Sequence, residues 1–113
     1  MRSELLFIVR VNPDNRQATM EVLSEIMTFA AFDVPLRLLF LDRGVRLLSS
    51  EIDPQIAGMM MALPLYGVAD LFVERESLDA IEIASSALNE QVISVPRSEI
   101  SRFIFQHKGV MGV

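Results

Sequence analysis

Acidic side chains follow three apolar segments of this chain. Asp14 comes after the first segment, Asp42 after the second and Glu74 after the third. Each acid stands near the point where an apolar run gives way to polar residues, as at the carboxyl end of a buried parallel strand. Ligands and reacting groups gather at that edge of open α/β sheets. Glu74 and the next two residues, Arg75 and Glu76, therefore occupy a position where a site is expected.

A purely structural role explains the same acids. Asp42 can begin a turn, and Glu74 and Glu76 favour the N-terminus of a following helix. A phosphoacceptor receiver domain also places acids at strand ends, but it usually has an acidic pair after its first strand. Asn12 and Pro13 stand there instead, and the lysine expected at the end of the last strand is missing. The receiver interpretation is therefore disfavoured.

Other chemistry is limited by the residues that the sequence lacks. Without cysteine the chain has no thiol nucleophile, disulfide or thiolate metal site. The single histidine, His107, fits a helix C-terminus, and no G-x-S-x-G elbow supports a serine triad. The loop 11–16 has no glycine to admit a phosphate, which argues against the usual nucleotide and flavin sites. We therefore predict no catalytic residue, cofactor or metal ligand, and a weak enzyme using Asp42, Glu74 and His107 is the least favoured hypothesis.

The spacing of apolar residues predicts the elements that hold these positions. Strands are predicted at residues 5–11, 36–41, 69–73, 91–95 and 110–113. Helices are predicted between them, with these boundary residues: Asp14 or Asn15 at the first N-cap, Asp53 and Pro54 at the second start, Ser77 before 78–88, Ser98 before the last helix and Gly109 after it. This alternation implies a three-layer α/β/α fold with a mostly parallel five-stranded sheet, flavodoxin-like, although two strand orders stay open.

Composition predicts a subunit interface. The 113 residues form one domain, 1–113, and 51% of them are hydrophobic, which is high for a small monomer. No apolar run approaches the ~20 residues of a membrane span. The excess apolar surface is therefore expected in a contact between subunits, although core packing explains the methionines equally well. The candidates for the interface are Met59, Met60, Met61, Leu65 and Tyr66.

The charge and the N-terminus exclude some partners. The net charge is −5 and the charges are interspersed, so no basic surface for nucleic acid is expected. The N-terminus has no signal peptide pattern, because Glu4 precedes an apolar run that is too short. We therefore expect a cytoplasmic protein with no membrane partner.

Three segments resemble the DsrE/DsrF/TusC sulfur-relay family, and within it the DsrF/TusC-like subunit. Residues 65–78 (LYGVADLFVERESL) carry most of the resemblance. Residues 40–48 (FLDRGVRLL) are similar to the family's strand, Asp, Gly-Val and Leu-Leu segment. The Val95-Pro96 pair, followed by a helix ending at Gln106-His107, is similar to its C-terminus. The helix after Leu78 departs from the family pattern because it lacks Arg-Gly-Leu.

The resemblance implies a DsrEFH-like domain in a heterohexamer of three related subunits, two copies each. One partner, of DsrE/TusD type, carries a persulfide on a cysteine at the position of Glu74, and a DsrH/TusB-type partner completes the set. The complex passes sulfur toward tRNA 2-thiouridine or serves sulfur oxidation. A chain without cysteine is then a non-catalytic subunit with a vestigial cleft at Asp42, Arg43, Glu74 and Arg75. A stand-alone homo-oligomeric binding or regulatory module is the alternative.

Overall fold

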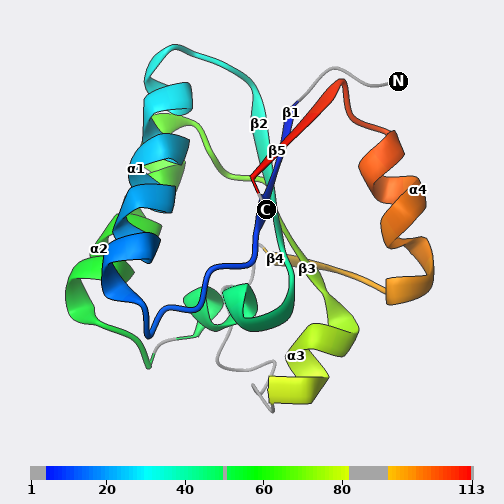
Figure 1. The fold of residues 1–113 in the computed structure, drawn as a ribbon. Helices are drawn as coiled ribbons and strands as arrows, with labels where there is room; N and C mark the ends of the chain where they lie inside the picture. The colour runs from blue at the N-terminus through cyan, green and yellow to red at the C-terminus, as the bar shows by residue number, and fades with distance from the viewer. Residues whose placement is uncertain (1–4, 50, 82–91, 113) are drawn as a thin grey trace.

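A parallel five-stranded sheet forms the centre of the molecule (Figure 1). The structure, a computed structural model, describes residues 5–49, 51–81 and 92–112. The strands are β1 (Leu5–Val9), β2 (Leu36–Phe40), β3 (Leu71–Glu74), β4 (Val92–Val95) and β5 (Gly109–Gly112). Their order is β4-β3-β2-β1-β5, and every neighbouring pair is parallel. The predicted α/β class is confirmed, and the open question of strand order is answered.

Helices cover both faces of the sheet (Figure 1). The α-helices are α1 (Arg16–Ala31), α2 (Pro54–Ala62), α3 (Arg75–Ile81) and α4 (Ile100–Phe105). The 3-10 segments are η1 (Asp42–Leu48), η2 (Leu63–Tyr66) and η4 (Arg97–Glu99). Figure 1 shows α1 and α2 on one side of the sheet and α4 on the other. No helix in the described ranges is long and apolar enough to cross a membrane.

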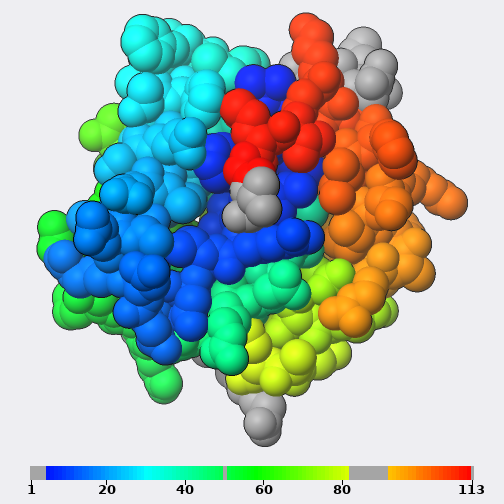
Figure 2. Space-filling view, viewed as in Figure 1, coloured from blue at the N-terminus to red at the C-terminus, as the bar shows by residue number. Residues whose placement is uncertain are grey.

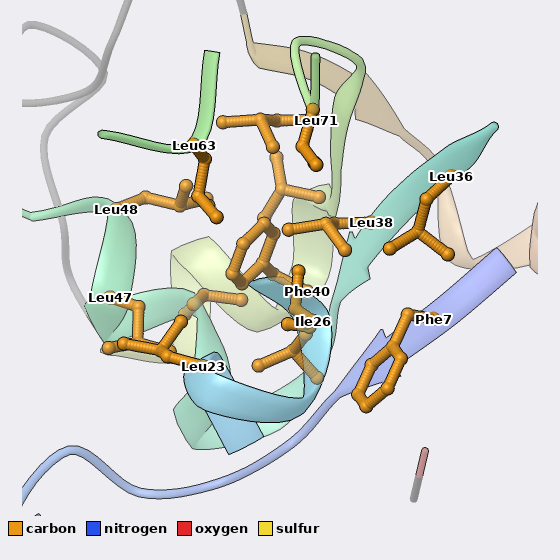
Figure 3. Close-up of a cluster of buried hydrophobic side chains, with 14 of the residues drawn as sticks. Phe7, Leu23, Ile26, Leu36, Leu38, Phe40, Leu47, Leu48, Leu63 and Leu71 are labelled. Carbon is orange, nitrogen blue, oxygen red and sulfur yellow. The ribbon is translucent and has the colours of Figure 1, made fainter. Parts of the chain in front are cut away.

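Two separate cores follow from the alternation of side chains along the strands. Phe7, Leu38 and Phe40 face α1 and α2, and they pack with Leu23 and Ile26 of α1 (Figure 3). The smaller core lies on the other face, where these strand residues meet α4: Leu6, Leu39 and Phe72. The central strands are apolar on both faces because helices cover both, as is usual in parallel sheets.

Local signals set two of the helix starts as predicted. The side chain of Asn15 accepts a hydrogen bond from the Ala18 N–H at 3.1 Å, so Asn15 is the N-cap of α1. Asp53 caps α2 by accepting from the Gln55 N–H at 2.8 Å, and Pro54 stands at the first helical position.

Three other predicted boundary residues are wrong. Ser77 is not a cap, because α3 begins at Arg75 and places Ser77 inside the first turn. Ser98 lies within η4 and does not cap α4. Gly109 begins β5 rather than ending the helix, which stops at Phe105. Residues 82–88 of the predicted helix 78–88, and Val113, lie outside the described residues.

Gly44 gives the fold a testable close approach. A Cβ at Gly44 would overlap the backbone carbonyl of Val9, whereas a Cβ at Gly58, inside α2, meets no atom within 4 Å. We expect Gly44→Ala to lower the free energy of unfolding by about 1–3 kcal/mol, because overpacking forces the backbone to shift. Gly58→Ala should raise it by about 0.5–1 kcal/mol. Urea denaturation measures both, and equal effects at the two positions would contradict the packing of η1 against β1.

Candidate functional site

Glu74 is a buried carboxylate at the carboxyl end of β3. The residue is only 7% exposed, so its charge requires compensation. Arg97, just after β4, supplies it: Nε donates to Glu74 Oε2 and a terminal nitrogen donates to Oε1, each at 3.1 Å. This two-point contact is the strong geometry for an arginine and a carboxylate. The backbone N–H of Arg97 also donates to Glu76 at 2.8 Å, which fixes the turn after β4.

Ser77 extends this contact to the end of β2. Its hydroxyl donates to Glu74 and accepts the backbone N–H of Asp42 at 2.9 Å. Asp42 has a φ of 53°, in the left-handed region that a non-glycine residue rarely adopts. The hydroxyl therefore holds a strained turn, and the carboxyl ends of β2, β3 and β4 are joined through one set of polar side chains. The ion pair from Arg10 to Asp42, at 3.5 Å, is solvent-exposed and contributes little.

The charges of the pair stabilise each other. Hydrogen bonding from Arg97 lowers the pKa of Glu74 below its ordinary value, against the opposite effect of burial, and the Ser77 hydroxyl adds to the lowering. The same contact with Glu74 raises the pKa of Arg97. Glu74 is therefore held ionised at neutral pH. A carboxylate held in this way is poorly suited to act as a general base, because its proton affinity has been reduced.

A shallow depression of about 400 Å³ lies above this pair. It is lined by Asp42, Arg43, Ser77, Ala80, Ile81 and Arg97. The structure thus brings Asp42 and Arg43, of the four residues predicted for a cleft, to its walls. Glu74 lies buried beneath them, and its carboxylate accepts hydrogen bonds from two of the lining side chains, Ser77 and Arg97. Arg75 is exposed and is not among the lining residues.

Sequence reasoning missed Arg97 as a site residue. The available signal was its position just after the apolar segment 92–95, which is the same kind of position that singled out Glu74. That signal becomes specific only when β4 is known to lie beside β3, and the strand order was open.

The remaining polar candidates belong to other parts of the molecule. Asp14 pairs with Arg46 at 3.0 Å, and this contact lowers the pKa of Asp14. His107 is buried, with Nδ1 2.9 Å from the Phe103 carbonyl and Nε2 3.4 Å from the Arg37 guanidinium. Because Arg37 can only donate, Nε2 accepts and Nδ1 carries the proton. The imidazole therefore binds the last turn of α4, in agreement with the predicted helix-end role.

The weak-enzyme hypothesis requires His107 to lie near Glu74, but His107 lies at the opposite end of the strands. It precedes the amino end of β5, which pairs with the start of β1, whereas Glu74 is at the carboxyl end of β3. Because the strands are parallel, these two positions lie at opposite ends of the sheet, so His107 does not share a site with Asp42 and Glu74. Among residues 5–49, 51–81 and 92–112, no three His, Asp or Glu side chains are grouped to share a metal ion.

The predicted interface residues divide into two groups. Met59 and Met60 are half-buried and pack against the larger core. The other three are exposed, Met61 by 79%, Leu65 by 86% and Tyr66 by 52%. We call Met61, Leu65 and Tyr66 the α2–η2 patch, since they lie at the end of α2 and in η2.

Solved structures with the same fold define the class of protein. The YchN protein from E. coli superimposes with a TM-score of 0.80 over 100% of both chains, at 15% identity. A protein of unknown function from Methanobacterium thermoautotrophicum gives 0.70 over 95% of this chain and 99% of its own, at 16% identity. These likenesses establish a small α/β domain of the YchN kind, and at such identities they concern the fold alone.

Sequence comparison then gives the family. No family model matches the chain. A protein named TusC homolog from Pseudomonas aeruginosa is 30% identical in an alignment 106 residues long, and the match covers 82% of this chain and 89% of the relative. The chain belongs to the TusC family, which confirms the resemblance found in its sequence.

The contact between Glu74 and Arg97 can be tested through its dependence on pH. A lowered folded-state pKa means that the ionised carboxylate stabilises the fold above its unfolded pKa, and that this stability is lost as the pH falls through the folded value. Glu74→Gln should therefore lower the free energy of unfolding by about 1–3 kcal/mol at pH 7. The difference from wild type should shrink as the pH falls below about 4.

Urea denaturation across this pH range measures the effect, with Glu21→Gln as the matched control. Glu21 is exposed on α1, and its replacement should change little at any pH. A Glu74→Gln protein as stable as wild type at pH 7 would contradict the importance of the pair.

Proposed function

We propose that this chain is a non-catalytic structural subunit of a sulfur-relay complex. The observation that carries the proposal is a TusC-family chain without any cysteine in its 113 residues. A persulfide requires a thiol, so the sulfur must be carried by another chain. The partners we propose are a cysteine-bearing subunit of DsrE/TusD type and a DsrH/TusB-type subunit, assembled as a heterohexamer.

The surroundings of Glu74 support a role without chemistry. The resemblance places the carrier cysteine of the paralogue at this position, at the end of the third strand. Here a buried carboxylate is bonded to Arg97 and Ser77, and its pKa is lowered. The polar groups around position 74 are therefore hydrogen-bonded to one another within the chain, as expected of a vestigial site.

Arg43 and Arg75 are the cations through which the region around Glu74 would act on a partner. Both are exposed, and Arg43 lines the depression beside Asp42. A cation close to a thiol favours its ionised form. We propose that in the complex Arg43 lies closer than Arg75 to the persulfide-bearing cysteine of the neighbouring subunit, because Arg43 borders the depression and Arg75 does not. The acceptor belongs either to tRNA thiolation or to sulfur oxidation.

The α2–η2 patch is the proposed contact with the paralogue. Its three large apolar side chains are more than half exposed in this chain. A partner would remove that apolar surface from water. Met59 and Met60 contribute from beneath, by holding α2 on the core. The alternative, a stand-alone homo-oligomer with a binding or regulatory role, would use the same surface without a paralogue.

Co-purification distinguishes these two functions. The chain is expressed with the DsrE/TusD-type and DsrH/TusB-type paralogues of its own genome, and the complex is measured by native mass spectrometry. We expect Leu65→Asp to prevent assembly, since a charge would be buried in an apolar contact. Met60→Asp is less informative because Met60 packs against the core, so its loss would disturb the fold.

Phe105→Asp is the matched control. Phe105 is 79% exposed, but it lies on α4, which packs against the other face of the sheet. Assembly should survive this change. An intact complex from Leu65→Asp would argue against the patch as the interface, and a wild-type chain that binds no paralogue would favour the homo-oligomer.

A further inference from the structure

The strand β5 forms one edge of the sheet. It pairs with β1 on one side, and within the described residues no strand pairs with its other side. An edge strand presents a row of backbone donors and acceptors that another strand can use. Figure 2 shows the red C-terminal residues at the molecular surface, beside the blue N-terminal strand.

The sequence of β5 lacks two of the usual protections of an edge. Gly109–Gly112 is only four residues long, but it contains no charged residue and no proline, which are two of the common guards against pairing with another chain. Val110 is 46% exposed. The opposite edge strand differs, because β4 runs directly into Pro96, which has no N–H to donate.

We propose that this edge binds a second copy of the chain, with the two β5 strands antiparallel across a two-fold axis. A two-fold contact uses the same surface on both copies, and an edge strand is complementary to itself when the copy runs in the opposite direction. The result is one continuous sheet through both molecules, with the strand direction reversed at the β5–β5 seam.

Charge permits this contact between two copies. Each chain carries a net charge of −5, so the copies repel unless they meet at a surface with little charge. The β5 strand is such a surface. Lys108 lies just before β5, and antiparallel pairing sets the two Lys108 side chains at opposite ends of the seam, where they do not oppose each other.

The β5 edge is also separate from the α2–η2 patch. The patch belongs to α2 and η2, whereas β5 is a strand at the edge of the sheet (Figure 1). The two contacts can therefore form together, and each can be removed without the other. The proposal goes beyond the proposed function, since it concerns the chain with its own copy rather than with a paralogue.

The experiment measures the mass of the purified chain alone by light scattering. We expect a dimer for wild type and a monomer for Val110→Lys, because lysine is a guard of natural edges. Val110→Thr is the matched control: it keeps the β-branched shape without a charge, and it should remain dimeric. Leu65→Asp should remain dimeric too, although it loses the paralogue.

Either of two results would overturn the proposal. One is a monomeric wild-type chain. The other is a dimer that survives Val110→Lys and is lost in Leu65→Asp, which would move the contact to the α2–η2 patch. Hydrogen exchange tests the contact in the wild-type chain, without a variant that could misfold. The β5 amides should become more protected as the protein concentration rises, while those of β4 stay unchanged. Equal exchange of β5 at all concentrations contradicts the pairing.

Discussion

The structure at the carboxyl ends of β2, β3 and β4 depends on one ion pair, between Glu74 and Arg97. Burial of the Glu74 carboxylate at the end of β3 is tolerated because Arg97 and Ser77 satisfy it. Each of those two residues is in turn fixed by a second contact, Arg97 through Glu76 and Ser77 through the backbone of Asp42. One charge therefore sets the positions of the turns that follow β2 and β4. Removal of either partner would leave the other polar group without compensation, so the network is expected to act as a unit.

Prediction from the sequence succeeded where the determining contacts are local. The caps at Asn15 and Asp53 reach only two or three residues along the chain, so the local sequence predicts Asp53 and narrows the first cap to Asp14 or Asn15. Ser77 shows the opposite case. Its type and position suit a helix cap, yet its hydroxyl binds Asp42, 35 residues away, because the fold brings those residues together. The pairing of Glu74 with Arg97 depends on the strand order in the same way.

The three consecutive methionines show a second limit of sequence reasoning. Successive residues of a helix point about 100° apart, so a run of three cannot share one environment. Periodicity indicates that they differ but not which one is exposed. That answer depends on how α2 lies on the core, which places Met59 and Met60 against it and leaves Met61 in solvent. Of the five side chains predicted for an interface, only Met61, Leu65 and Tyr66 are therefore exposed in this chain.

The contacts of Glu74 also bear on how such a chain can evolve. Suppose that a single substitution placed cysteine at position 74. The thiol would be smaller than the carboxylate, and Arg97 and Ser77 would both lose the group to which they donate. A thiol at position 74 would thus weaken the fold, unless Arg97 changed as well. The side chains packed around Glu74 therefore restrict which residues this position can accept by a single substitution.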